Sequence, residues 1–262
     1  MPLSNVSLDE LIIDDEDSFS HVALYGTLKR MLRRSGHRFL IPSGGQEASW
    51  DRTVFLNLTY WNADQGADIL CDRHLSADVV AHIAWHHVVS TKLADLVGVA
   101  GAKSAAGLFF AESIASAFDL YLVGRLFDNA PDSDFIGTQV PIMAEAAEQA
   151  GLSSESFAAL LAEVVRDPER AFEDLRALLV DVTGALFACR DAVSAQHVLE
   201  QFDSHRFAVL LHHFQLSAWI LYARAYGGGD CAAEAETKIR ALDASLRSAP
   251  VSLDWLEQNW AH

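Results

Sequence analysis

Two histidines and a glutamate are the residues of this sequence best suited to metal chemistry. His82 and His86 form an HxxxH motif in the apolar segment 78–89, and Glu112 follows in a second apolar segment, 105–126. In an α-helix, four residues turn the chain by about 400°, so both imidazoles project from one face, one turn apart. Two imidazoles and a carboxylate bind Zn²⁺ in many enzymes, and they also bind non-haem Fe²⁺. The spacing therefore predicts a metal site formed by His82, His86 and Glu112.

The same residues also have an interpretation without a metal. Histidines four apart occur on many helices by chance, and most of them are packed or hydrogen-bonded. A carboxylate among apolar residues needs a partner, and for Glu112 an ion pair with Arg125 or Lys103 is the alternative to a metal ion. His87 projects about 100° away from His86, so it is a poor third ligand on the same helix.

The segments that position these residues are predicted to be helical after a short β-rich part. β-Branched and aromatic runs bounded by Gly and Pro predict a few strands within residues 37–72. Ser76 is a suitable N-cap for a helix at 77–96. Hydrophobic periodicity and breakers predict further helices at 18–36, 105–126, 138–150, 154–165, 168–188, 190–202, 204–226 and 232–248.

This organisation predicts an α+β fold that is predominantly helical. We expect an α/β part at residues 1–130, which carries the HxxxH helix and Glu112, and a helical lobe at residues 131–262. Asn129-Ala130-Pro131-Asp132 interrupts the helical pattern between them.

The order of these motifs resembles the core of the thermolysin-like gluzincin metallopeptidases. Tyr60-Trp61-Asn62 ends a predicted strand, the HxxxH helix follows, and Glu112-Ser113-Ile114-Ala115 lies in the next helix. The likeness covers roughly residues 53–125, under a third of the chain. It implies a zincin-like N-terminal part with a short sheet and a metal helix, Zn²⁺ bound by His82, His86 and Glu112, and a helical C-terminal lobe that closes over a cleft.

Three departures from the family pattern argue against peptide hydrolysis. The family's general base directly follows the first histidine, and this position is Ile83, which cannot accept a proton. The family's aspartate four residues after the glutamate ligand is Ser116 here, with Asp119 the nearest substitute, and the strand asparagine that holds substrate corresponds to Leu58. We therefore expect a different reaction on a related scaffold.

Four further residues are candidates for the missing acid–base group. His87 and Asp119 lie in the two metal-binding segments, and His212 and His213 lie in the predicted helix 204–226. In gluzincins the C-terminal lobe donates a histidine that stabilises the oxyanion, so the resemblance implies this role for His212 or His213. The alternative for both histidines is a packed or cleft-lining role.

Composition restricts the class of partner. The chain has 262 residues, about half of them hydrophobic, and a formal net charge of −17. An acidic surface repels phosphate backbones, so we expect no nucleic-acid partner.

The most apolar segments, 108–123 and 207–222, are interrupted by acidic or histidine side chains and predict buried helices instead of membrane spans. An acidic N-terminus and three widely spaced cysteines favour the reducing cytoplasm.

The sequence therefore predicts a cytoplasmic metalloenzyme that acts on a small molecule by a non-peptidase reaction. Zn²⁺ is the expected cofactor and Fe²⁺, as in non-haem Fe(II) enzymes, is the alternative. A non-catalytic pseudopeptidase that serves as a binding or scaffold protein is a second function open to this sequence, and a metal-free helical protein is a third. Nothing in the sequence indicates the oligomeric state.

Overall fold

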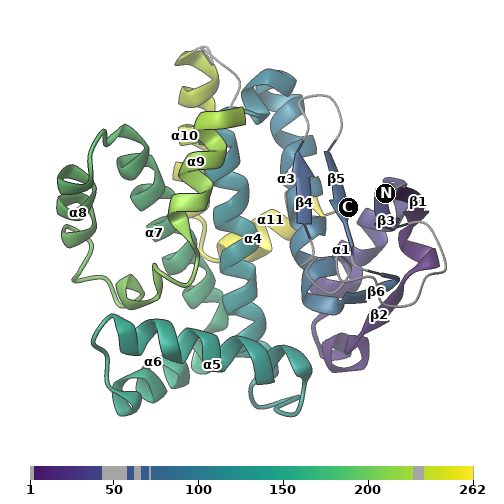
Figure 1. Ribbon diagram of the computed structural model, residues 1–262, viewed down its shortest axis with the longest axis horizontal. Helices are drawn as coiled ribbons and strands as arrows, with labels where there is room; N and C mark the ends of the chain where they lie inside the picture. The colour runs from purple at the N-terminus through teal and green to yellow at the C-terminus, as the bar shows by residue number, and fades with distance from the viewer. Residues whose placement is uncertain (1–2, 43–57, 62–65, 71, 227–232, 262) are drawn as a thin grey trace. The chain divides into compact units, whose positions relative to one another are not determined.

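The computed structural model describes residues 3–42, 58–61, 66–70, 72–226 and 233–261. The described chain is predominantly helical with a small mixed sheet, as the sequence predicts (Figure 1). It divides into two compact units, Met1–Ala84 and Trp85–His262, and the boundary falls between two consecutive residues of the helix Ala77–Ala102. The division into lobes at residues 1–130 and 131–262 stays a prediction.

The first unit contains a four-stranded sheet. Strand β1 pairs antiparallel with β3, β3 pairs parallel with β5, and β4 pairs antiparallel with β5 at the edge of the sheet. The strands predicted within residues 37–72 are thereby confirmed for the described part of that range, whereas β1 was not predicted. Residues 53–57 of the predicted edge strand lie outside the described residues. The strand bounds are β1 Leu3–Ser7, β3 Arg38–Pro42, β4 Leu58–Trp61 and β5 Gly66–Ile69.

A second, two-stranded sheet leads into the HxxxH helix. Strand β2 (Ile12–Asp14) pairs parallel with β6 (His74–Ser76), and β6 continues directly into helix α3 (Ala77–Ala102). The predicted helix 77–96 is confirmed. Helix α3 begins at Ala77, and its regular part ends at Gly98, whose backbone angles are non-helical (φ 77°, ψ 164°).

The predicted helix 18–36 is shorter than expected. Residues Leu8–Glu10 and Glu16–His21 form the 3-10 helices η1 and η2, and helix α1 spans only Ala23–Arg34. Val22 is extended (φ −99°, ψ 94°), so it separates η2 from α1. Helix α1 buries Leu24, Tyr25, Leu28 and Leu32.

A histidine–aspartate pair joins the two strands of the small sheet. Nδ1 of His74 lies 2.9 Å from Oδ1 of Asp14 on β2, and the hydrogen bond and negative charge of Asp14 raise the pKa of His74 above its ordinary value. A raised histidine pKa adds stability below about pH 6.5, and this stability is lost as the pH rises through the folded-state pKa. We expect the melting temperature of the wild type to exceed that of His74→Gln at about pH 6, with the difference shrinking by about pH 8.5. A difference that stays constant or grows with pH would contradict this.

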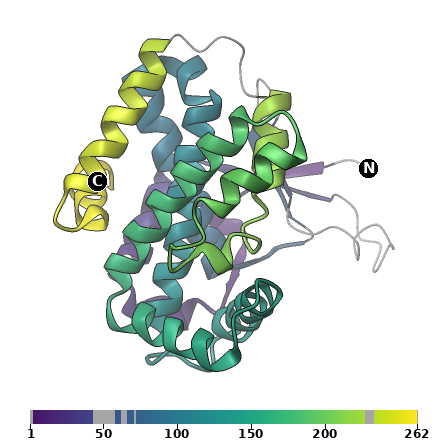
Figure 2. The same cartoon turned by 90° about the vertical axis from the view of Figure 1, so that its left-hand side faces the viewer.

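Helix α4 is the centre of the second unit. It packs against α5, α6, α7, α9 and α10, and both views place α5 and α6 at its C-terminal end (Figures 1 and 2). By length and composition α4 could cross a membrane, but its apolar window is 78% buried within the protein. The helices are α4 Ala105–Leu126, α5 Asp134–Gln149, α6 Ser154–Arg166, α7 Pro168–Ala188, α8 Ala192–Glu200, α9 Leu216–Tyr226, α10 Ala233–Ser248 and α11 Ser252–Trp260.

Gly124 permits the close approach of α4 to the α6–α7 turn. A Cβ atom at this position would lie 2.7 Å from Cβ of Pro168 and 2.8 Å from the carbonyl oxygen of Val164. Both distances are shorter than a normal contact, so any side chain here would push α4 away from its main helical neighbour. The helix that carries Glu112 is thus held at a fixed distance from α7.

The prediction of one helix over residues 204–226 is wrong. Only Leu216–Tyr226 is α-helical, and residues 201–215 form turns with a short 3-10 helix, η3, at Ala208–Leu210. Gln215 has a left-handed conformation (φ 48°), which prevents a continuous helix. Arg206 also binds Glu163 and Asp174 on the neighbouring helices, and these ion pairs hold the turns against α6 and α7.

Candidate metal centre

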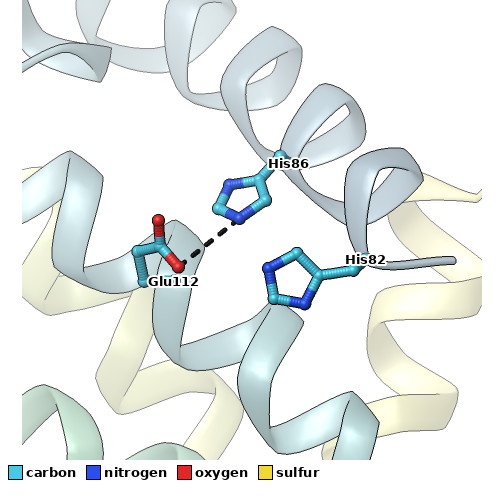
Figure 3. Close-up of side chains that lie close together, drawn as sticks. All are labelled: His82, His86 and Glu112. Atoms are coloured by element: carbon cyan, nitrogen blue, oxygen red, sulfur yellow. Dashed lines mark ion pairs between the residues drawn. The ribbon is translucent and has the colours of Figure 1, made fainter. Parts of the chain in front are cut away.

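His82, His86 and Glu112 come together as predicted. His82 and His86 lie one turn apart on α3, and Glu112 lies on α4. One ligand atom from each side chain lies within 4.8 Å of the other two, so the three residues could hold a metal ion. Nε2 of His86 is 3.5 Å from Oε2 of Glu112 (Figure 3). His86 and Glu112 both belong to the second compact unit, and His82 lies one turn before His86 in the regular part of α3 that precedes Gly98.

The spacing of the ligand atoms fits a small divalent cation. Tetrahedral zinc with ligands at about 2.0–2.1 Å places its ligand atoms roughly 3.3 Å apart. The 3.5 Å between His86 and Glu112 is close to that value, and all three ligand atoms lie within 4.8 Å of one another. The donor set carries one negative charge when both imidazoles are neutral, as metal binding requires.

The three side chains are half-buried, which suits a site that binds an external ligand. The side chain of His86 is 13% exposed and that of Glu112 is 28% exposed. Arg125, one of the two alternative partners of Glu112, binds Tyr121 and Glu169 instead. A half-buried carboxylate beside two imidazoles is a donor set that a divalent cation satisfies well.

Residues that flank the two histidines on α3 form part of the core. Trp85 is fully buried and its ring packs edge-on against Phe118 of α4, with the ring centroids 5.7 Å apart. Ile83 is buried as well, with 7% of its surface exposed. The residue directly after the first histidine is therefore an apolar core residue, and it has no group that could transfer a proton.

Asp119 and His213 are near enough for their charges to interact. Asp119 is seven residues after Glu112 on α4, so it lies on the same face about 10 Å along the helix. Burial lowers the pKa of His213 below its ordinary value, and the negative charge of Asp119 acts in the opposite direction. Nδ1 of His213 is buried and has no hydrogen-bond partner among the described residues. This histidine is therefore neutral at about pH 7.

For the other two candidates for acid–base chemistry, His87 and His212, the structure gives only their position and exposure. His87 is half-buried on α3 directly after His86, and His212 is exposed in the turns before α9. His205 is in the same turns, where its Nδ1 accepts a hydrogen bond from the Phe207 N–H. The continuous helix that was predicted to carry His212 and His213 does not form, because these residues lie in the turns.

Sequence reasoning missed a polar group that lies near the start of α3. The hydroxyl of Tyr25 donates a 3.1 Å hydrogen bond to Glu16, which also pairs with Lys29. Asp78, one turn before His82, acts electrostatically on Tyr25. Tyr25 and Asp78 are more than fifty positions apart in the chain, so no local motif could have linked them.

No family model, no curated protein and no solved structure matches the chain.

Proposed function

We propose that the protein is a metal-dependent enzyme in which His82, His86 and Glu112 bind one divalent cation. The supporting observation is the convergence of their ligand atoms to within 4.8 Å at a half-buried position. Zn²⁺ is the proposed cofactor, with Fe²⁺ as the alternative, because this donor set suits both ions. When bound, the ion would supply a Lewis acid that polarises an oxygen atom of the substrate.

The residues around the site favour a reaction other than peptide hydrolysis. Ile83 occupies the position of the peptidase base and belongs to the core. His213 and Asp119 are the proposed acid–base pair, because the charge of Asp119 acts on His213 and the buried Nδ1 of His213 has no hydrogen-bond partner among the described residues. The nearby carboxylate of Asp119 would then stabilise the imidazolium.

The order of elements supports a gluzincin-like scaffold for this enzyme. The edge strand β4 is followed by β5, β6, the histidine helix α3 and the glutamate helix α4. Leu58, at the start of β4, lacks the amide that would hold a peptide backbone. We therefore propose that the enzyme acts on a small molecule in the cytoplasm.

A non-catalytic role is the second candidate, and the burial of Ile83 favours it. A protein that kept the metal ligands and lost the base could use the metal for stability or for binding alone. Such a pseudopeptidase would bind zinc as tightly as the enzyme does, so metal binding cannot separate the two candidates and turnover must be measured.

Glu112→Gln separates these functions. Untagged wild-type protein, loaded with Zn²⁺ or Fe²⁺, is incubated with a cytoplasmic small-molecule extract, and depletion of each compound is followed by mass spectrometry. We expect at least one compound to be consumed by the wild type and by Glu148→Gln, an exposed control on α5, and at least about 100-fold more slowly by Glu112→Gln. Equal profiles for all three proteins would overturn the enzymatic proposal.

A further inference from the structure

Asp78 is placed to contact the first metal-binding histidine. It lies one turn before His82 on α3, and both side chains are half-buried. Side chains of a helix lean toward its N-terminus, so the imidazole of His82 lies over the turn that carries Asp78. Figure 3 shows one ring nitrogen of His82 facing His86 and Glu112, while the other is on the opposite edge of the ring.

The charge of Asp78 acts on a hydrogen-bonded group from other elements of the first unit. Tyr25 of α1 is buried, and its hydroxyl donates to Oε1 of Glu16, which pairs with Lys29. Burial, together with the negative charges of Glu16 and Asp78, raises the pKa of Tyr25 far above its ordinary value. The phenol therefore stays protonated and keeps its hydrogen bond to Glu16.

Asp78 is an acid on the face of α3 that carries the metal-binding histidines. A half-buried negative charge attracts a positive one more strongly than a charge in water does. An imidazole that is bound to a divalent cation would supply that positive charge.

We propose that Asp78 is a positioning residue whose carboxylate accepts a hydrogen bond from Nδ1–H of His82 and so directs Nε2 toward the metal. The buried hydroxyl of Tyr25, hydrogen-bonded to Glu16, is near enough for the charge of Asp78 to act on it. Such outer partners of metal-bound histidines fix the ring orientation and its tautomer, and their loss weakens metal binding by about 10–100-fold. The inference rests on the proposed function, because it requires a metal at His82.

Helix stability is the competing explanation of Asp78. An acidic residue in the first turn of a helix interacts favourably with the helix dipole, and Asp78 occupies that turn of α3. That role would affect the melting temperature of the metal-free protein and leave the affinity of the folded protein for metal unchanged. Metal affinity therefore distinguishes the two explanations.

Asp78→Ala tests the proposal, with Asp95→Ala as its matched control. Asp95 is exposed on the same helix and lies about 20 Å from His82 along α3. At that distance physiological salt largely screens the charge of Asp95 from His82. In competition with a chromophoric chelator, we expect Asp78→Ala to bind Zn²⁺ about 10–100-fold more weakly than the wild type. Asp95→Ala should stay within about twofold, and Asp78→Asn, which keeps an acceptor oxygen, should lie between them.

Nitrogen NMR provides a second measurement that needs no variant. In the zinc-loaded wild type, Nδ1 of His82 should carry the proton and Nε2 should be bound to the metal. An Asp78→Ala affinity within about twofold of the wild type, an equal loss in Asp95→Ala, or an unprotonated Nδ1 at His82 would each overturn the proposal. Failure of the wild type itself to bind zinc would instead overturn the proposed function.

Discussion

His82→Ala is expected to weaken the binding of Zn²⁺ by at least about 100-fold. Structural zinc sites gain roughly 10–16 kcal/mol from about four ligands, or about 3 kcal/mol for each ligand. In this protein His82 is one of three described side chains whose ligand atoms converge. The variant would keep the His86–Glu112 pair, which is separated by 3.5 Å, but two ligands hold zinc weakly. Removing a half-buried imidazole should leave the helical circular dichroism unchanged.

His197→Ala is the matched control for this loss. His197 is an exposed histidine on α8, outside the three-residue group. Isothermal titration of both variants with Zn²⁺, on protein without a histidine tag, compares a predicted ligand with a surface histidine. Equal affinities for the wild type, His82→Ala and His197→Ala would show that zinc binds elsewhere on the chain.

Arg176→Met should lower the free energy of unfolding by about 3 kcal/mol, because it breaks a buried charge network. The side chain of Arg176 on α7 is fully buried. It donates two hydrogen bonds to Glu173, of 2.7 and 2.8 Å, and one of 2.6 Å to Asp243 of α10. Methionine fills a similar volume without charge, so it leaves two half-buried carboxylates facing each other, with Arg247 still bound to Asp243.

Arg240→Met measures the effect of the same substitution at the surface. Arg240 is also on α10, and it pairs with Glu236 one turn away where both side chains are exposed. Such pairs contribute about 0.3–0.5 kcal/mol. Urea unfolding at about pH 7 should therefore show a large shift for Arg176→Met and almost none for Arg240→Met. A decrease of less than about 1 kcal/mol in the free energy of unfolding of Arg176→Met would contradict a stabilising role for this buried network.

Much of the helical framework could be predicted because its helices have strong local signals. The bounds of α4 and α7 coincide with the predicted segments 105–126 and 168–188. Ser104 caps α4 by accepting from the Gly107 N–H, and Asp167 caps α7 in the same way from Arg170. Local patterns of this kind are independent of the rest of the fold, so a sequence reveals them.

The segment before α9 could not be predicted, because its conformation depends on distant partners. Residues 207–222 are apolar enough for a helix, but Arg206 binds Glu163 and Asp174, and Gln215 turns the chain through a left-handed angle. Strands β1 and β2 were missed for a related reason. Each is short, and each forms only by pairing with a later part of the chain.

The metal-binding group was predicted more completely than its surroundings. Helical spacing determines that His82 and His86 share a face, and a glutamate on the next apolar helix is visible in the sequence. The electrostatic effects of Asp119 on His213 and of Asp78 on Tyr25 arise only when distant segments fold together. The metal ligands could therefore be identified from local sequence patterns, whereas the charged groups that act on the surrounding side chains could not.

X-ray absorption at the zinc edge tests the central claim most directly. Untagged protein is loaded with one equivalent of Zn²⁺, desalted and measured for both zinc content and zinc coordination. A site formed by His82, His86 and Glu112 predicts one retained zinc per chain, with imidazole nitrogens and carboxylate oxygen at about 2.0–2.2 Å. Loss of the zinc on desalting, or a sulfur shell at about 2.3 Å from cysteine ligands, would contradict it.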